Sequence, residues 1–318
     1  MHPVPIPTLF DCWTCDNSVR NILVVRVSAL VSLAVHALIF QPSSDFNIAM
    51  ADFIRSAKSG CDWGDHELLA YNIAISSLLP DEFFSTPDPS LNNIDPDILN
   101  SPPNHDNPAI SDATARYLGY LHFTIMPAQG SFMDDFAAKT LKLLGFNERR
   151  TTMSMRYTIP FTICSDAGCV AQTDVCLIHN SQSFILLLLI RDEALIGRND
   201  GKAQVIAGAI AAFQFNNRRR RDQGLDLLDA MTIPCITMAG TRPTFYLVPV
   251  TMELSNAVIG GQCPAAQTQV LRCVTVAADM WCTNAGMGDT EYRKLALKCL
   301  LAFKALAKSH WVRILEGV

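Results

Sequence analysis

The spacing of apolar and polar positions after residue 112 predicts alternating helices and strands. Residues 133–144 place their apolar side chains at helical spacing, and Gly145 follows where a C-terminal cap is expected. The third of the strand-like runs that follow, FILLLLI, is continuously apolar, as in a strand buried on both faces. The resulting order is α-β-β-β-α-β-β, with the elements expected at residues 133–144, 153–164, 170–179, 183–190, 201–216, 235–238 and 244–250.

Helical spacing also dominates both ends of the chain. Segments 18–40, 46–57 and 65–79 are expected to be helices, and a long final helix is expected at 290–315. The third segment starts at Asp65, which suits an N-cap. Its apolar side consists of Leu68, Leu69, Ile73 and Ile75.

The composition changes between these two regions. Seven of the seventeen prolines fall between residues 80 and 108, and no lysine or arginine occurs between Lys58 and Arg116. Such a segment predicts an acidic linker or long surface loop. We therefore divide the chain into an N-terminal helical region (1–79), a Pro-rich acidic linker or loop (80–112) and an α/β domain with a C-terminal helix (113–318).

Composition and charge exclude several classes of protein. With 49% hydrophobic and 17% charged residues, the chain is neither disordered nor fibrous. The net charge of −5 gives no overall attraction for nucleic acid, so any such contact needs a local basic patch. Eleven cysteines are too few for a disulfide-stapled scaffold, and the N-terminus lacks a secretory signal pattern. We expect reduced thiols and an intracellular location, in the cytoplasm or nucleus.

Two local patterns have alternative interpretations. Cys12 and Cys15 have the spacing of a redox or zinc pair, but no second ligand pair follows, so two ordinary thiols are favoured. The apolar stretch 22–40 is long enough for a bilayer, but Arg26 and His36 interrupt it. We expect a buried helix and no membrane span. No P-loop, GxGxxG, GxSxG or HExxH motif occurs, so no small-molecule cofactor is indicated.

One arrangement of polar residues suggests chemistry. Asp174 lies in the second strand of the predicted sheet, Arg191 to Glu193 end the third strand, and Gln204 lies on the following helix. This element order with these polar positions resembles the PD-(D/E)XK, or restriction-endonuclease-like, core: an α-β-β-β-α-β mixed sheet. The connection at residues 179–182 is short enough for a hairpin, which would bring Asp174 beside the end of the third strand.

The chain also resembles, from about residue 10 to its end, a multicopy group of proteins of mushroom-forming fungi. The stretches that carry this resemblance are ELLAYNIAISSL, DDFAAKTLKLLGF, AQTDVCLIH, AIAAFQFNN and TIPCITMAGTRPTFYLVPVT. The nuclease-like resemblance implies a metal-dependent phosphodiester hydrolase acting on DNA or RNA with Mg²⁺ or Mn²⁺. Carboxylates at strand ends would hold the ion, which activates the attacking water, and a lysine would stabilise the developing charge.

Several positions depart from the pattern that this resemblance implies. The fungal group usually ends the third strand in Glu-Asp-Lys, whereas this chain has Arg191 and Glu193 in the outer two positions. A glutamate usually follows the DDFA motif, where this chain has Lys139. These charge reversals predict an inactive or strongly impaired nuclease. Alternatively, Glu193 joins Asp174 as a metal ligand and Lys202 replaces the missing lysine, which would leave a rearranged, active site.

Each candidate residue also has a structural interpretation. Asp174 could accept hydrogen bonds at a strand end, and Arg191 with Glu193 could form a surface pair. Lys202 and Gln204 could be ordinary helix-surface residues. The run Arg218, Arg219, Arg220 and Arg221 could bind nucleic-acid phosphates or could be solvated. Two functions therefore stay open: a metal-dependent nuclease, and a non-catalytic module that binds nucleic acid or protein. Local basic charge without convergent carboxylates would favour the second.

Overall fold

The protein is described by a computed structural model that covers residues 54–86, 88–103, 108–126, 131–192, 201–277 and 285–318. The chain divides into two units, Met1–Ala49 and Met50–Val318, and every element below belongs to the second. The helix expected at 18–40, most of the helix expected at 46–57 and the Cys12/Cys15 pair lie outside the described residues. Residues 54–57, which are described, are not helical.

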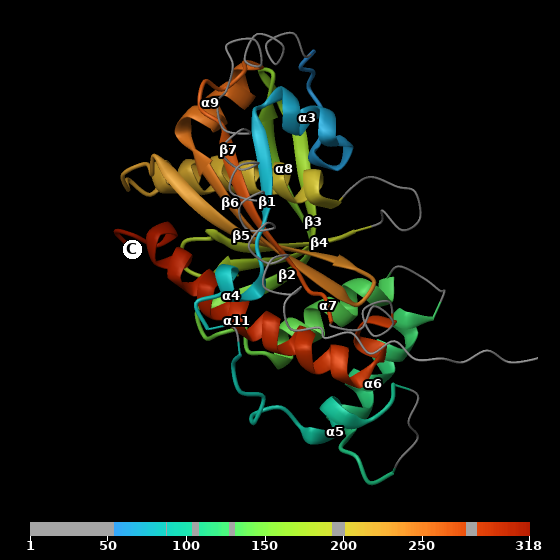
Figure 1. Cartoon of the computed structure of the whole chain (residues 1–318). Coiled ribbons are helices and arrows are strands. Elements are labelled where there is room, and N and C mark those ends of the chain that lie inside the picture. The colour runs from blue at the N-terminus through green and yellow to red at the C-terminus, as the bar shows by residue number, and fades with distance from the viewer. Residues whose placement is uncertain (1–53, 87, 104–107, 127–130, 193–200, 278–284) are drawn as a thin grey trace, which may run out of the picture. The chain divides into compact units, whose positions relative to one another are not determined.

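A seven-stranded mixed sheet lies at the centre of the described unit, in the order β1-β7-β6-β5-β4-β3-β2 (Figure 1). Neighbouring strands are antiparallel except for two parallel pairs, β4 with β5 and β1 with β7. The strands are β1 (Ile73–Ser77), β2 (Thr151–Ile163), β3 (Asp166–His179), β4 (Ile185–Arg191), β5 (Ala230–Ala239), β6 (Arg242–Thr251) and β7 (Thr268–Val274).

Helices cover both faces of this sheet. Helix α8 packs across β2 to β6, and α11 packs against β4, β5 and β6. Strand β4 is buried over its first six residues, as its apolar sequence predicts. No described helix has the length and hydrophobicity needed to cross a bilayer. The helices are α3 (Asp65–Ala70), α4 (Pro80–Phe83), α5 (Pro96–Asn100), α6 (Asp112–Ile125), α7 (Ser131–Leu143), α8 (Gly201–Asp222), α9 (Met252–Gly260) and α11 (Thr290–Ile314), with the 3₁₀ turns η1 (Gly60–Asp62) and η3 (Gly286–Gly288).

Helix α8 is buried on nearly all sides over its first thirteen residues. Its sequence AQVIAGAIAAF has small residues that let the helix lie close to the sheet. At Gly208 an added Cβ would lie 3.2 Å from the Leu188 Cδ1 atom of β4, tighter than an ordinary van der Waals contact. A larger residue at this crossing would therefore require the Leu188 side chain to shift by a few tenths of an ångström.

The predicted element order after residue 112 is confirmed as α7-β2-β3-β4-α8-β5-β6, and the fold class is α/β. The predicted final helix is confirmed as α11. Gly145 has φ +72°, as expected for the cap of α7. Helices α6 and α9 and strand β7 were not predicted.

The helix predicted over residues 65–79 is wrong after Ala70. Gly64 is the N-cap instead of Asp65, and α3 spans only Asp65–Ala70. Asn72 adopts φ +52°, which ends the helix, and the chain then enters β1. Strand β1 pairs with β7, with Ile73 opposite Thr268. Residues 73–77 therefore belong to the same sheet as the α/β domain, and the boundary drawn at residue 79 has no structural counterpart.

The predicted linker at 80–112 is packed onto the sheet unit. It contains α4 and α5, and Phe83, Phe84, Ile94 and Ile98 are all at most 6% exposed. Phe84 makes an edge contact with Phe245 of β6, with the ring centroids 5.5 Å apart. This segment is rich in proline and acidic residues, but its few apolar side chains are buried and hold it against the sheet unit.

A buried arginine of α11 makes hydrogen bonds to the segment 80–112. Arg293 has no exposed surface and donates to the carbonyl oxygens of Met287 (2.8 Å), Ile98 (2.7 Å) and Ser101 (2.8 Å). These carbonyls belong to the ends of η3 and α5, whose helical bonds are missing there. One guanidinium thus satisfies several backbone acceptors that would otherwise be buried without donors.

Replacing Arg293 by Met should therefore destabilise the fold by about 3–5 kcal/mol, because it leaves buried carbonyls without donors. Arg313→Met on the same helix is the matched control, since its exposed pair with Glu316 is worth about 0–1 kcal/mol. Urea unfolding of both variants measures the difference. Equal stability losses in the two variants would contradict this role for Arg293.

Candidate functional site

The candidate site lies where β4 separates from β3. The last paired residues of these strands are Val175 and Leu189. Beyond them, the Thr173 hydroxyl donates to the Leu189 carbonyl (2.8 Å), and the Asp174 Oδ2 atom accepts from the Arg191 backbone N–H (2.6 Å). Side chains of β3 thus replace two ladder bonds on this edge of β4, while its other edge stays paired with β5 as far as Arg191. The predicted proximity of Asp174 to the end of the third strand is confirmed.

Two arginines and a second carboxylate complete the site. Asp134 on α7 is 5% exposed, and its carboxylate oxygens each lie 3.5 Å from a guanidinium nitrogen: Oδ1 from Arg191 Nη1, and Oδ2 from Arg156 Nη2. Arg191 therefore contacts both acids, one through its side chain and the other through its backbone. We call Asp134, Asp174, Arg156 and Arg191 the Asp134 cluster.

Arg156 reaches the cluster through an irregular backbone. The register of β2 and β3 pairs Met155 with Val175 and Tyr157 with Thr173, which places Arg156 level with Asp174. Arg156 has φ +50°, in the left-handed region that costs a non-glycine residue roughly 1–3 kcal/mol. The surrounding strands therefore hold Arg156 in an unfavourable conformation beside Asp174.

The electrostatics of the Asp134 cluster are dominated by burial. Burial raises the pKa of Asp134, and the negative charge of Asp174 raises it further, while Arg191 and Arg156 oppose these effects. The two carboxylates are thus close enough to affect each other. With both acids ionised, two negative and two positive charges balance within the cluster.

The other predicted site residues have different contacts. Asp192 Oδ1 accepts from the Gly201 N–H (3.4 Å) at the start of α8. Lys202 Nζ lies 2.9 Å from Asp65 Oδ1 of α3, and Gln204 donates to the Cys61 carbonyl of η1 (3.1 Å). The contacts of Lys202 and Gln204 connect α8 to the segment before β1. Glu193 lies outside the described residues.

Lys139 does not occupy the place expected for it. Its Nζ atom lies 4.3 Å from the centre of the Tyr120 ring on α6, a cation–π geometry. Asp134, one turn earlier and within the same DDFA motif, is the α7 residue that contacts Arg191. The charge of Lys139 therefore contributes to the α6–α7 contact, and Asp134 supplies the α7 contact to Arg191.

Sequence reasoning missed Asp134 and Arg156. Asp134 begins a helix beside a second acid, Asp135, where acidic residues are ordinarily solvated and favoured by the helix dipole. The DDFA motif was the available signal, but only its following position was interpreted. Nothing in the sequence around Arg156 indicates its positive φ.

The arginine run lies within α8, which extends six residues beyond its predicted end. Arg220 is 2% exposed and donates to the carbonyls of Asp226, Ile314 and Glu316. Arg219 is half-buried, 5.8 Å from the Phe215 ring centre. Only Arg218 and Arg221 are exposed. The expectation that all four are available to phosphates is therefore wrong.

The donor set of the Asp134 cluster does not fit a divalent cation as it stands. Both oxygens of Asp134 face guanidinium groups, and one oxygen of Asp174 accepts a backbone N–H. Within the described residues, no three His, Cys, Asp or Glu side chains are grouped as metal ligands. The Asp134 cluster is thus an ion-paired network whose carboxylates already have cationic or N–H partners.

Comparison with protein-family models finds none that matches this chain, and a search of curated proteins finds no match either. The resemblance to PD-(D/E)XK nucleases stays a prediction from the sequence.

The raised pKa of Asp134 predicts a pH dependence of stability. In the unfolded chain the pKa of an aspartate carboxyl is about 3.9, and in the native protein the pKa of Asp134 is higher. The stability that the protonated carboxyl contributes to the native state is therefore lost as pH rises through the native pKa. Asp134→Asn lacks this loss. Its stability relative to wild type should therefore increase as pH rises above about 4.

Urea unfolding between pH 4 and 7 measures this difference. Asp135→Asn is the matched control, because it removes the same charge from an exposed position one residue along α7. A stability difference between Asp134→Asn and wild type that does not change with pH would contradict the assignment.

Proposed function

We propose that this chain is a PD-(D/E)XK nuclease-like protein that has lost metal-dependent cleavage of phosphodiester bonds and acts as a binding module. The order α7-β2-β3-β4-α8-β5 supports the proposal, as does Asp174 on β3 beside the end of β4. Asp134, from the helix that precedes the strands, adds a second carboxylate at the same place. Both positions suit an ancestral metal site.

The contacts of Arg191 carry the proposal. Its guanidinium lies 3.5 Å from one carboxylate, and its N–H lies 2.6 Å from the other. A metal-dependent hydrolase needs carboxylate oxygens free to bind the cation. An arginine in that position repels a divalent cation and competes for the same oxygens. The reversed charge therefore stabilises the acids without a metal.

Lys202 gives further support. A relocated catalytic lysine must reach the transferring phosphate, but Lys202 Nζ pairs with Asp65 at 2.9 Å. This pair offsets the positive charge that the reaction would need.

One observation favours a second candidate, an active nuclease with a rearranged site. The charge of Asp174 contributes to the raised pKa of Asp134, so two carboxylates converge beside the end of β4. An active enzyme would then use Asp134 with Asp174 as metal ligands, in place of Asp174 with Glu193.

Cleavage assays separate these candidates. Wild-type protein should show no metal-dependent cleavage of plasmid or single-stranded DNA or RNA in Mg²⁺ or Mn²⁺. The double variant Arg191→Glu, Glu193→Lys restores the acid and lysine of the expected pattern, and should gain Mn²⁺ binding by calorimetry. Loss of one pre-positioned donor typically costs about 10²–10³ in rate, so any recovered cleavage should exceed the wild-type level by that order.

Asp174→Ala in both backgrounds is the control. Robust wild-type cleavage that Asp174→Ala and Asp134→Ala each abolish would refute the proposal and support the rearranged site. Metal binding by the double variant that survives Asp174→Ala would show that the ion binds elsewhere.

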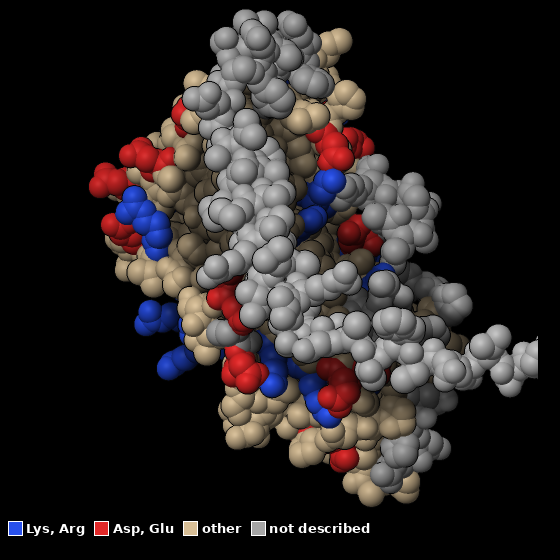
Figure 2. Space-filling view, in the orientation of Figure 1, with Lys and Arg blue, Asp and Glu red and all other residues tan. Residues whose placement is uncertain are grey.

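A nucleic-acid partner needs exposed basic side chains. On the face shown in Figure 2, acidic and basic side chains of the described residues lie interspersed rather than in one basic stripe. Arg218 and Arg221 are exposed at the C-terminal end of α8, where they line a groove with Met252 and Asn256 of α9. Because α8 rises about 1.5 Å per residue, Arg218 lies roughly 25 Å along the helix from Gly201. These arginines could bind phosphate, but not at the Asp134 cluster.

If the protein binds nucleic acid through this groove, Arg218→Ser with Arg221→Ser should weaken binding and reduce the slope of log K against log salt by roughly 1.4–1.8. Fluorescence anisotropy between 50 and 200 mM salt would measure the slope. The matched control, Lys294→Ser with Lys298→Ser, removes the same charge from the distant half of α11. Equal slope changes in both pairs, or none in the arginine pair, would exclude the groove.

A further inference from the structure

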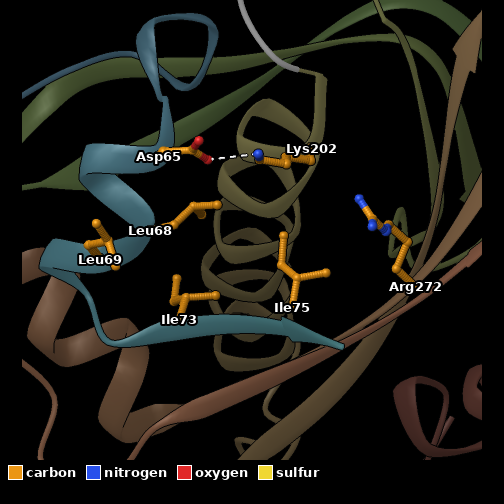
Figure 3. A pocket seen from close by; sticks show the side chains of 7 residues that line it. All are labelled: Asp65, Leu68, Leu69, Ile73, Ile75, Lys202 and Arg272. Carbon is orange, nitrogen blue, oxygen red and sulfur yellow. Dashed lines mark ion pairs between the residues drawn. The ribbon is translucent and has the colours of Figure 1, made fainter. Parts of the chain in front are cut away.

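A second site, separate from the Asp134 cluster, lies between α3, β1, β7 and α8 (Figure 3). It is a cavity of about 420 Å³, within the range of roughly 300–1,000 Å³ typical of small-molecule sites. Its lining consists of four aliphatic side chains, one acid and two bases: Leu68, Leu69, Ile73, Ile75, Asp65, Lys202 and Arg272.

The aliphatic lining comes from two adjacent elements. Ile73 and Ile75 are two residues apart on β1, so they share a face of the strand, and Leu68 of α3 lies next to them (Figure 3). Leu68 and Ile73 are each 5% exposed, whereas Leu69 is 44% exposed. The cavity thus has a buried aliphatic floor, and Leu69 is the most exposed of its leucines.

The charged lining is asymmetric. Lys202 already has a carboxylate partner in Asp65, at 2.9 Å. Arg272 is instead fixed by an uncharged oxygen, since its Nε and Nη2 atoms donate to the Ser77 hydroxyl at 3.1 and 2.7 Å. Among the described residues, no carboxylate lies within ion-pair distance of Arg272. The lining therefore carries one excess positive charge, because arginine stays protonated.

Arg272 is oriented without being neutralised, which suits recognition of an anion. Its remaining N–H groups could pair with a carboxylate, for which the planar guanidinium is well shaped. The opposite wall is purely aliphatic. None of the described residues that line the cavity is aromatic, so none of them would stack on a nucleobase.

We propose that this cavity binds a medium-chain aliphatic carboxylate, with the chain on Leu68, Ile73 and Ile75 and the carboxylate on Arg272. This activity is independent of the proposed nuclease-like ancestry, because none of the lining residues belongs to the Asp134 cluster.

Isothermal titration calorimetry of the full chain with decanoate, decanol and decylammonium tests the proposal. Wild-type protein should bind decanoate at least about tenfold more tightly than decanol, and decylammonium least. Arg272→Gln keeps polar hydrogen-bonding capacity but removes the charge, and should weaken decanoate binding about tenfold while leaving decanol binding unchanged. Arg272→Lys, which keeps the charge, should retain part of the preference.

Arg313→Gln on α11 removes the same charge outside the cavity and should leave decanoate binding unchanged. Circular dichroism confirms that each variant is folded. Equal binding of decanoate and decanol by wild type would show an aliphatic cavity without anion recognition and would overturn the proposal. Absence of decanoate binding, or equal weakening by Arg272→Gln and Arg313→Gln, would also overturn it.

Discussion

Two hydrogen bonds from β3 side chains complete the edge of β4 beyond its last pair with β3, and the position of the Asp134 cluster depends on them. A strand buried on both faces must satisfy every backbone N–H and carbonyl group without water. Where β4 leaves β3, Thr173 bonds the Leu189 carbonyl and Asp174 bonds the Arg191 N–H. On its other edge, β4 pairs in parallel with β5 as far as Arg191. This geometry places Arg191 next to α7, and the Asp192 side chain against the first residue of α8.

Sequence patterns predicted the elements whose burial is continuous or strongly periodic. The run FILLLLI fits a buried strand, and the apolar spacing after Asp134 fits a helix, so these patterns predicted the order from α7 to β6. The strands β1 and β7 were missed because each is short and pairs with a partner some 195 positions away. In isolation, IAISS continues the helical spacing of the preceding residues as well as it alternates. Only the long-range pairing decides between them.

The same limit applies to the candidate site. Asp174 and Arg191 were predictable neighbours because a short hairpin joins their strands, which makes their contact local. Asp134 comes from a helix, and its burial depends on how α7 packs on β2 and β3. The arginine run was misinterpreted for a related reason. Arg220 is buried because carbonyls at the end of α11 accept its N–H groups, and those acceptors lie over ninety residues away in the chain.

Two carboxylates that converge beside a strand end do not by themselves indicate catalysis. The partners of their oxygens decide what they can do. A half-buried acid that accepts an N–H from a strand end has a structural reason to be present, and Asp174 has that reason. Arg191 compensates two carboxylates that would otherwise face one another, since the charge of Asp174 raises the pKa of Asp134 and that of Arg191 lowers it. The arginine therefore makes it less costly to keep both acids ionised. In the function proposed above, Arg191 took the place of a metal ion, so the carboxylates were kept for the hydrogen bond and ion pair that they still make.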